Sequence, residues 1–328
     1  MILAGDIGGT KTRLALFAPG PGRSDPVSER TYSSQEYPGL EVIAREFLRA
    51  TGAAIESACF GVAGPVKEGR SSTTNLAWVV DARDLARDLR LPRVALLNDL
   101  EASAFGLEAL RTDEFVVLQE GIPGAAGNQA LIAAGTGLGE AALYWDGRRH
   151  RVFATEGGHA GFAPADETQI ELLRYLVRRF EPVSWERVLS GPGLVNIYSF
   201  LRDSGRGEEP SWLADEISAG EPAAVISAAA LSGRSALCSE ALDLFVALYG
   251  AESGNLALKV MATGGVFIGG GIAPKILARL RGPGFVRAFV AKGRMRPLLE
   301  AMPVRVILND RLALLGAARY AASEEPIG

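Results

Sequence analysis

The chain has 328 residues, which corresponds to roughly two domains of ordinary size. Hydrophobic residues make up 48% of it and charged residues 22%, so it carries enough apolar surface for a sizeable core and is not disordered as a whole. The net charge of −4 excludes a strongly basic nucleic-acid-binding surface. Glycine is the departure from average, with 39 residues, about 12% of the chain against a usual share of about 7%.

The N-terminus and the two cysteines indicate the compartment in which the protein is expected. Residues 1–6 include no basic segment, and their apolar run is too short for a signal peptide. The uncharged residues 260–274 are glycine-rich and shorter than the roughly 18 to 20 apolar residues that a membrane span needs. Cys59 and Cys238 lie far apart in apolar surroundings, which excludes a disulfide framework or a CxxC metal site. We therefore expect a cytoplasmic protein with buried, reduced thiols and with no membrane or nucleic-acid partner.

A strand, a glycine-rich turn and a second strand occur twice along the chain. Residues 3–17 and 132–144 share this pattern about 130 residues apart, close to one domain length. Each copy is followed by a third short β-rich segment, near residues 29–33 and 151–155. The duplication predicts two similar α/β halves.

The other elements of the first half alternate between helix and strand patterns. The predicted elements are a helix over 37–50, a strand over 57–62, a helix from Asp81 to about 89, a strand over 93–97 and a helix over 99–110.

The second half is predicted to be richer in helices. The predicted elements are an amphipathic helix over 166–180, short helices near 185–189 and 194–201, a long helix over about 234–261 and a buried strand over 265–268. Gly250 and Gly254 within the long helix predict a kink or close packing there.

A last strand over 304–308 and a helix over about 311–322 follow an apparently complete second half. We expect both to return to the first half. The predicted domains are therefore a small one of residues 1–109 plus about 302–328 and a large one of residues 110–301.

The two glycine-rich turns have the chemistry of phosphate sites. Gly8 and Gly9 leave backbone N–H groups open to an anion, Thr10 adds a hydroxyl donor and Lys11 a positive charge. Gly135, Thr136 and Gly137 repeat the pattern in the other half. Neither turn is a Walker A loop or opens a helix as a dinucleotide fingerprint does. One such turn alone is typical of a plain tight hairpin, but two matched copies favour phosphate binding from two sides of one cleft.

A third glycine cluster follows the buried strand after the long helix. Gly269, Gly270 and Gly271 would let the backbone approach a flat ligand such as adenine closely. The alternative is that these glycines serve close helix–strand packing.

Two aspartates end strands beside these features. Asp6 precedes Gly8, where a carboxylate would repel phosphate unless a metal lay between them, so it suggests Mg²⁺ held largely through water. The alternative is that Asp6 caps the turn by hydrogen bonds. Asp99 lies at the carboxyl end of a strand, the usual ligand edge of an α/β sheet, and is a candidate general base. Its alternative role is the acidic residue at the N-terminus of the next helix.

Glu156 and His159 lie three residues apart on a predicted non-helical turn. A metal site is disfavoured because no further cysteine or histidine ligands lie near, and hydrogen bonding to a polyol suits the pair better. Glu186 follows Ser184, a candidate N-cap, so its alternative role is a partner of the helix dipole.

Taken together, these segments resemble the bacterial glucokinases of the hexokinase/actin-like ATPase superfamily over nearly the whole chain. The matching stretches are residues 5–10, 74–75, 97–99, 135–139, 156–159, 186–194 and 264–271. The resemblance implies two similar actin-like ATPase (ribonuclease H-like) α/β domains with a cleft between them. It also implies ATP-dependent phosphorylation of glucose at its 6-hydroxyl, which is the entry to glycolysis.

The resemblance assigns roles to individual residues. Asp99 matches the general base and Asn98 a neighbouring sugar ligand, while Asn75 lies in a matching stretch at the sugar site. The remaining matches are glucose-hydroxyl ligands at Glu156, His159 and Glu186, a first phosphate motif at Asp6, Gly8, Gly9 and Thr10, a second at Gly135, Thr136 and Gly137, and an adenosine region at Gly269, Gly270 and Gly271.

The chain departs from a related branch of sugar kinases and repressors in two ways. It has no cysteine between residues 59 and 238, so we expect no zinc, and its phosphate motif begins at residue 5, which leaves no room for a helix-turn-helix before it. The resemblance suggests a homodimer. The alternatives are a hexose kinase of broader preference (mannose, fructose or N-acetylglucosamine), a catalytically silent sugar sensor, or an actin-like filament or chaperone ATPase, which would not need the sugar-binding residues.

Overall fold

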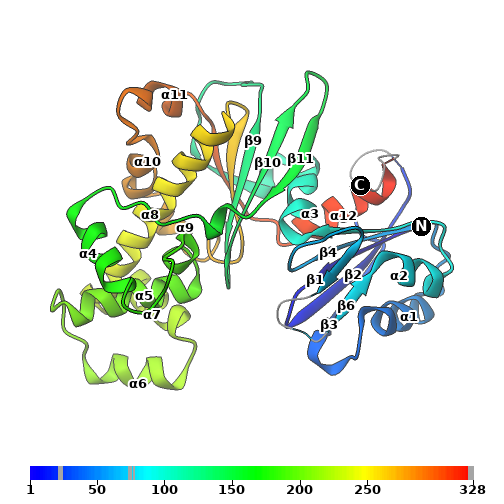
Figure 1. The fold of residues 1–328 in the computed structure, drawn as a ribbon, viewed down its shortest axis with the longest axis horizontal. Helices are drawn as coiled ribbons and strands as arrows, with labels where there is room; N and C mark the ends of the chain where they lie inside the picture. The colour runs from blue at the N-terminus through cyan, green and yellow to red at the C-terminus, as the bar shows by residue number, and fades with distance from the viewer. Residues whose placement is uncertain (21–24, 73–75, 77, 324–328) are drawn as a thin grey trace. The chain divides into compact units, whose positions relative to one another are not determined.

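A computed structural model (Figure 1) describes residues 1–20, 25–72, 76 and 78–323. The chain divides into two compact units. The first consists of Met1–Thr112 with Asn309–Gly328, and the second of Asp113–Leu308. In the described part of the chain, no helix is long and apolar enough to cross a membrane.

The first unit is built on a five-stranded sheet with the order β3-β2-β1-β4-β7. Its first three strands form an antiparallel meander, and β1, β4 and β7 run parallel to one another. The strands are β1 (Ile2–Ile7), β2 (Lys11–Phe17), β3 (Ser28–Ser33), β4 (Ser57–Val62) and β7 (Val94–Asn98).

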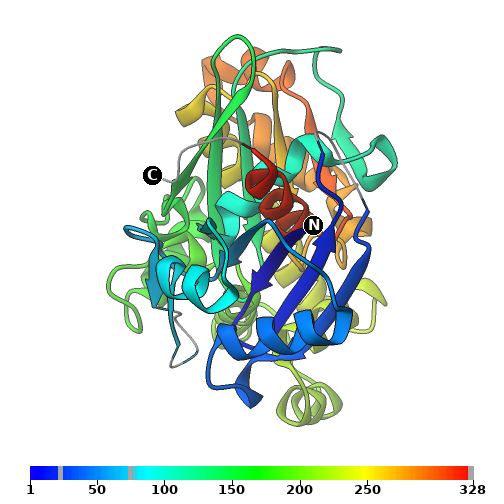
Figure 2. The same ribbon diagram turned by 90° about the vertical axis from the view of Figure 1, so that its right-hand side faces the viewer.

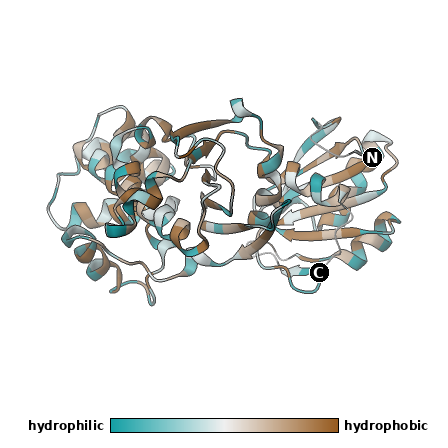
Figure 3. Ribbon diagram, turned by 90° about the horizontal axis from the view of Figure 1, so that it is seen from above, coloured by the Kyte–Doolittle hydropathy of each residue, from teal (hydrophilic) through white to brown (hydrophobic). Residues whose placement is uncertain are grey.

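Helices cover both faces of this sheet (Figure 2). Because side chains alternate between the faces of a strand, Leu3 and Ile7 pack toward α1 (Leu40–Thr51) and α2 (Ala82–Leu89). Ile2 and Ala4 pack on the other face with α3 (Asp99–Gly106) and α12 (Leu312–Ala322). The strands of this unit are accordingly coloured mostly as hydrophobic in Figure 3.

The helix expected to begin at Asp81 does so. Asp81 is the N-cap of α2, and its carboxylate accepts hydrogen bonds from the backbone N–H groups of Arg83 and Asp84. The strand β6 (Val79–Asp81) precedes it and pairs with β5 (Arg70–Ser72) in a small separate hairpin.

The second sheet repeats the first. Its order is β11-β10-β9-β12-β13-β8, in which β11, β10 and β9 form an antiparallel meander while β9, β12 and β13 run parallel. Five strands thus match the first sheet in order and direction, and an antiparallel β8 is added at the edge. The strands are β8 (Phe115–Gln119), β9 (Gln129–Ala134), β10 (Leu138–Trp145), β11 (His150–Thr155), β12 (Gly265–Gly269) and β13 (Val304–Ile307). The predicted duplication is confirmed.

The last strand differs from the expectation. It was expected to return to the first half, but β13 lies between β12 and β8 in the second sheet, and only α12 returns. Strand β13 is the counterpart of β7, so the second sheet has all five matching strands only when β13 is included. The division between the units therefore follows Leu308 rather than a residue near 302, and the first division follows Thr112.

Close contact with α3 accounts for the return of α12. A Cβ on Gly316 of α12 would lie 1.7 Å from the carbonyl oxygen of Ala102 in α3, so only glycine fits where the two helices meet. Leu314, Leu315 and Tyr320 of α12 are buried in the same core. Strand β13, which precedes α12, has only a short and mostly apolar pattern that suits either sheet. For this reason the sheet that it joins was predicted wrongly.

Eight helices are described in the second unit. They are α4 (Glu167–Leu176), α5 (Gly191–Asp203), α6 (Ser211–Ala219), α7 (Pro222–Leu231), α8 (Ala236–Val260), α9 (Leu277–Leu280), α10 (Pro283–Val290) and α11 (Arg296–Glu300). The long helix α8 lies at the centre of their core, with Leu242, Phe245 and Tyr249 fully buried. Helices α6, α7 and α9 to α11 were not anticipated, and the segment expected near 185–189 is a short 3-10 helix, η5 (Trp185–Arg187).

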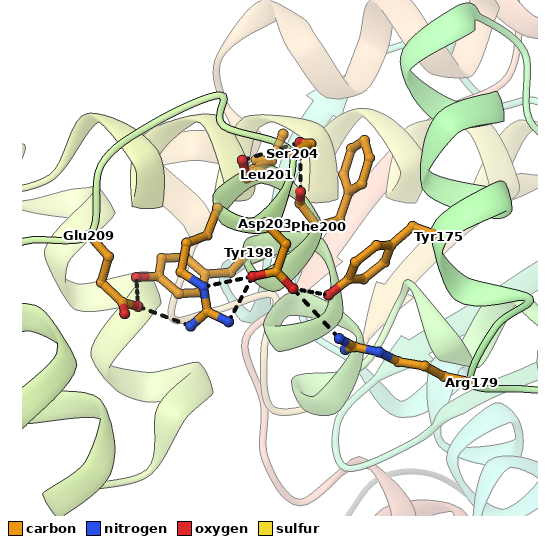
Figure 4. A network of polar contacts seen from close by, with 9 residues as sticks. Tyr175, Arg179, Tyr198, Phe200, Leu201, Asp203, Ser204 and Glu209 are labelled. Carbon is orange, nitrogen blue, oxygen red and sulfur yellow. Dashed lines mark hydrogen bonds and ion pairs between the residues drawn. The ribbon is translucent and has the colours of Figure 1, made fainter.

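A polar network fastens α4 to α5 (Figure 4). The hydroxyl of Tyr175 donates to Asp203 Oδ2 at 2.6 Å, and Arg179 forms an ion pair with the same carboxylate at 3.6 Å. On the other side of α5, Tyr198 donates to Glu209, which also pairs with Arg202. These contacts hold α5 at its C-terminal end, while its N-terminal end meets the candidate site described below.

Gly250 and Gly254 let α8 and α10 lie in close contact. A Cβ on Gly250 would come within 2.1 Å of the carbonyl oxygen of Phe285, and one on Gly254 within 2.5 Å of that of Phe289. Real Cβ atoms do not approach other atoms so closely. The close packing predicted at these glycines is confirmed, and their presence within a helix is explained.

Gly250→Ala should lower the free energy of unfolding by about 1–3 kcal/mol, because its methyl group would force α8 and α10 apart. Gly284→Ala in α10 is the matched control, since its methyl group would lie at an ordinary 3.7 Å from Val246 Cγ1. That variant should keep or slightly raise the stability, by up to about 1 kcal/mol. Urea denaturation of both proteins makes the comparison, and equal losses would contradict the packing argument.

Candidate active site

A buried serine supports the turn between β1 and β2 through hydrogen bonds. The backbone N–H of Gly8 donates to the carbonyl oxygen of Lys11 at 2.9 Å. Ser34, fully buried in the 3-10 helix η1 (Ser34–Glu36), donates from Oγ to the carbonyl oxygen of Gly8 at 2.8 Å, and its N–H donates to that of Thr10 at 3.0 Å. Thr10 and Lys11 are exposed at the tip. A hydroxyl and an ammonium group therefore project from a backbone that is fixed in position.

Asp6 lies just before this turn, on the face of β1 that packs toward α3 and α12. Its neighbour across the strand pair is Arg13, which forms an ion pair with Asp310 at 3.1 Å. Burial raises the pKa of the Asp6 carboxyl, while Arg13 lowers it and Asp310 raises it. A carboxylate partly removed from water beside an open backbone turn fits a hydrated Mg²⁺, which prefers one or two carboxylates together with water and phosphate oxygens.

Asn98 and Asp99 lie at the same edge of the first sheet as this turn. The strand register pairs Ile7 with Val62, and Val62 with Asn98. The ends of β1 and β7 are therefore separated by β4 alone, which corresponds to about 10 Å at a strand spacing of about 4.8 Å. The first glycine turn and the candidate base therefore lie within reach of one small molecule.

The sequence of α3 fixes both residues at its N-terminus. Asn98 is the N-cap: its Oδ1 accepts from the N–H of Leu100 at 2.9 Å, its Nδ2 donates to the carbonyl oxygen of Gly64 at 3.0 Å, and Glu101 completes a capping box. Asp99 is the first helical residue, and its Oδ1 also accepts from Leu100 at 2.9 Å. This position fits the helix-terminal alternative as well as the catalytic prediction, so geometry alone does not separate them.

The second glycine turn and the third glycine cluster adjoin each other in the second unit. Strands β9 and β12 run parallel and end side by side, so residues 135–137 and 269–271 follow at one edge of the sheet. Gly270 has a φ of +81°, and a Cβ there would lie 2.3 Å from the carbonyl oxygen of Ala134. Gly270 thus lets this turn lie close to the end of β9, a contact between strand ends and not the helix–strand packing of the alternative. A Cβ on Gly271, in contrast, would meet no described atom within 4 Å, which leaves its backbone open to a ligand.

The N-terminus of α5 meets the second turn. The N–H of Gly135 donates to the carbonyl oxygen of Gly137 at 2.8 Å, which closes the turn, and the N–H of Gly191 donates to the carbonyl oxygen of Gly135 at 2.8 Å. Ser190 caps α5 by accepting from the N–H of Gly193 at 3.0 Å. The turn is therefore positioned by a helix that the network of Figure 4 holds at its other end.

The segment 156–159 lies directly on β10. A Cβ on Gly158 would be 2.1 Å from the carbonyl oxygen of Leu138, and one on Gly157 only 1.9 Å from Oε2 of Glu140. The flanking side chains point outward: Glu156 and His159 are 69% and 61% exposed, with 4.0 Å between Oε2 and Nε2. The two glycines thus bring the segment onto the strand, and the acid and the imidazole remain accessible to a ligand.

Glu186 contacts the second turn. Its Oε2 accepts from the backbone N–H of Leu138 at 3.1 Å, and a Cβ on Gly137 would lie 2.5 Å from that oxygen. The N–H of Trp185 donates to the carbonyl oxygen of Ala160 at 2.9 Å, which places Glu186 beside the 156–159 segment as well. The capping alternative is disfavoured, because the helix there has three residues and its N-cap makes no side-chain capping bond.

The sequence-predicted residues thus form one group in each unit. In the first unit the group comprises Asp6, Gly8, Gly9, Thr10, Lys11, Asn98 and Asp99, and in the second Gly135, Thr136, Gly137, Glu156, His159, Glu186, Gly269, Gly270 and Gly271. Asn75 lies outside the described residues. Within the described ranges, no group of three or more histidine, cysteine, aspartate or glutamate side chains could hold a metal ion.

Sequence reasoning missed the residues that support the turns from inside. Ser34 is one of them, and Tyr249 of α8 is another. The Tyr249 hydroxyl is fully buried. It accepts a hydrogen bond from the N–H of Ala134 at 3.1 Å and donates one to the carbonyl oxygen of Gly269 at 3.2 Å. It joins the ends of β9 and β12. A polar residue at a core position of a long helix is the signal that could have indicated it.

Comparison with known proteins addresses the function of these groups. A family model described as glucokinase matches residues 3–324. A glucokinase of Nostoc punctiforme is 43% identical over 98% of this chain and 99% of its own length. The chain belongs to the glucokinase family. This membership supports ATP-dependent phosphorylation of glucose as its activity.

Solved structures agree with the assignment to the glucokinase family. A glucokinase from an Antarctic psychrotroph is 30% identical with a TM-score of 0.85, over 98% of both chains. A ROK-family glucokinase of Streptomyces griseus, solved in complex with glucose and AMPPNP, shares the fold at 22% identity with a TM-score of 0.66, over 98% of both chains. The predicted actin-like ATPase fold is confirmed.

Ser34→Ala should raise the KM for ATP about fivefold, because the Gly8 carbonyl loses a hydrogen bond of about 1 kcal/mol and the first turn loses its support. The KM for glucose should change less. Ser204→Ala is the matched control: its Oγ donates to the carbonyl oxygen of Phe200 at 2.7 Å, on α5 of the second unit. Steady-state kinetics would contradict the role of Ser34 if both variants gave the same KM for ATP.

Proposed function

We propose that the chain transfers the γ-phosphoryl group of ATP to the 6-hydroxyl of D-glucose, giving glucose 6-phosphate and ADP, with Asp99 as the general base. The observation that carries this proposal is the common edge of the first sheet, where the turn after β1 and Asp99 after β7 are separated by β4 alone. Phosphoryl transfer to a hydroxyl needs a positioned phosphate and an acceptor for the hydroxyl proton.

Backbone groups would bind most of the nucleotide. In the first turn the N–H of Gly8 closes the turn on Lys11, so the proposed phosphate donors are the Gly9 N–H, the Thr10 hydroxyl and the Lys11 ammonium. In the second turn the N–H of Gly135 likewise closes the turn, and the proposed donors are Thr136 and Gly137. The open backbone at Gly271 supports an adenosine site at 269–271. The Streptomyces griseus relative, which holds AMPPNP, supports a nucleotide as donor.

Asp6 would hold Mg²⁺ through water. Its carboxyl is partly buried beside Arg13, and a divalent cation would favour its charged form against the effect of burial. Mg²⁺ bound there would neutralise charge on the β- and γ-phosphates.

Each unit has residues that are proposed to bind sugar hydroxyls. Asn98 uses both acceptor positions of its amide oxygen in the cap of α3 and one N–H on Gly64, which leaves one N–H donor for a sugar hydroxyl. Glu156, His159 and Glu186 supply further acceptors and a donor, and Asn75 is proposed at the same sugar. Glucose is uncharged and dense in hydroxyls, so carboxylates with two oxygens each suit it.

Asp99 would take the proton of the 6-hydroxyl while the oxygen of that hydroxyl attacks the γ-phosphorus. The bond between the γ-phosphorus and the bridging oxygen of ADP breaks as the new bond forms. Water could replace the sugar hydroxyl and hydrolyse ATP, so ordering of the site by bound sugar would protect the nucleotide.

We further propose that the enzyme works in the cytoplasm and as a homodimer. The location is supported by two buried, unpaired cysteines, which suit a reducing compartment, and by the use of ATP. The dimer is supported by the family resemblance alone.

Asp99→Asn should lower kcat by about 10²–10⁴-fold, because the amide keeps the bond to Leu100 but cannot accept the hydroxyl proton. Glucose binding, measured by titration calorimetry, should persist. Asp84→Asn is the matched control, since it removes another acid from a first helical turn. If a coupled ADP assay over a panel of hexoses gave near-normal turnover for Asp99→Asn, Asp99 would have only its helix-terminal role.

Glu186→Ala should raise the KM for glucose about tenfold or more, because a charged acceptor for a sugar hydroxyl contributes about 1.5–3 kcal/mol. The KM for ATP should rise less, through the loss of the bond to Leu138. Glu167→Ala, an exposed first-turn acid of α4, is the control. An unchanged KM for glucose would return Glu186 to a structural role.

A further inference from the structure

Glu140 is a carboxylic acid buried where the proposed mechanism does not use it. It lies on β10, opposite Thr155 and Ile132 of the neighbouring strands, and is 1% exposed. Its Oε1 has no hydrogen-bond partner among the described residues. A buried carboxyl without a partner for one oxygen costs free energy, so its retention needs a reason.

The carboxyl lies directly beneath the proposed sugar-binding segment. Gly157 rests on it so closely that a Cβ there would be 1.9 Å from Oε2. The Glu140 backbone is tied to the same segment, because Thr155 Oγ1 donates to its carbonyl oxygen at 3.0 Å and accepts from the N–H of Gly157 at 3.2 Å. The carboxyl is therefore in direct contact with the backbone between Glu156 and His159.

A second buried acid, on α8, interacts with Glu140 through its charge and a side-chain hydrogen bond. Glu252 is 0% exposed and accepts from Asn255 Nδ2 at 2.7 Å and from Lys259 Nζ at 3.3 Å. Lys292, after α10, donates to Asn255 Oδ1 at 2.6 Å. One turn earlier on α8, Tyr249 joins the ends of β9 and β12, so one helix supports both the nucleotide turns and the sugar segment.

We propose that Glu140 and Glu252 share one proton and that this hydrogen-bonded pair, which carries a single negative charge beside Lys259, positions the 156–159 segment for glucose. Glu140 is a positioning residue in this scheme, since it acts through Gly157 and does not touch the sugar. The inference rests on the proposed assignment of Glu156 and His159 as sugar ligands.

The charges around the pair set the pH at which the proton leaves. The pKa of the Glu140 carboxyl is raised to about 8, first by burial and then by Glu252, while Lys259 lowers it. Burial raises the pKa of Glu252, whereas Asn255, Lys259 and Lys292 lower it. Burial lowers the pKa of Lys292, and burial together with the charge of Glu140 raises the pKa of Tyr249.

The proton is held more tightly in the folded protein than in the unfolded chain. A raised carboxyl pKa means that the free energy of unfolding falls as the pH rises from about 4.5, and that the fall levels off above about 8. Above about 8 the two carboxylates repel each other beneath Gly157, and the segment loses its position.

The test is the pH dependence of the KM for glucose. If glucose binds only the protonated pair, the KM should rise about tenfold between about pH 7 and pH 9 in the unaltered enzyme. Glu140→Gln and Glu252→Gln each replace the shared proton by an amide donor, so either variant should hold this rise below about twofold. Glu209→Gln, a carboxyl of the α5 network, is the control and should retain the full rise.

The outcomes separate this inference from the proposed function. Without glucose-dependent ADP formation at about pH 7, the function itself fails. If the enzyme phosphorylates glucose but its KM does not change with pH, the shared proton is overturned. If Glu140→Gln keeps the alkaline rise, the shared proton is overturned as well, and another group such as Lys292 titrates. Should one glutamine variant fail to fold, the other variant and calorimetric glucose binding to the unaltered enzyme at both pH values give the same decision.

Discussion

Backbone N–H groups can approach a phosphate only where strands end without side chains in the way, and the structure is organised around this constraint. It is met where β1 turns into β2 and where β9 turns into β10, and at both places glycines follow the strand. The duplicated sheet repeats the geometry, because the same order of strands places each turn at the carboxyl end of a parallel strand. Asp99 in the first unit follows β7, which is separated from β1 by β4, and the 269–271 cluster in the second unit follows β12, the parallel neighbour of β9.

Open turns must be held in position by groups that lie behind them. Ser34 supports the first turn through the carbonyl oxygen of Gly8. Tyr249 and the N-terminus of α5 support the second, and the close contact of α8 with α10 at Gly250 keeps Tyr249 in place. The same helix supplies Glu252, so the inferred proton-sharing pair belongs to the system that positions the turns.

The sequence predicted the parts of this arrangement that have a local signal. The two glycine turns, their flanking strands and the cap at Asp81 are patterns of a few residues, and the structure has them where they were expected. The position of β13 was wrong, because a four-residue apolar strand carries no mark of the sheet that it joins. Ser34, Tyr249 and Glu140 were missed because their roles depend on contacts with residues more than ten positions away. For Asp99 the sequence left two roles open, and its place at the start of α3 is compatible with both.

The central claim is that Asp99 accepts the proton of the sugar hydroxyl that attacks ATP. A crystal structure of the enzyme with glucose and a non-hydrolysable ATP analogue tests it most directly. We expect an oxygen of the Asp99 carboxylate within about 2.6–3.2 Å of the 6-hydroxyl, with that hydroxyl directed at the γ-phosphorus. A fully occupied complex in which the 6-hydroxyl is bonded to another group, and Asp99 only to the N-terminus of α3, would contradict the account.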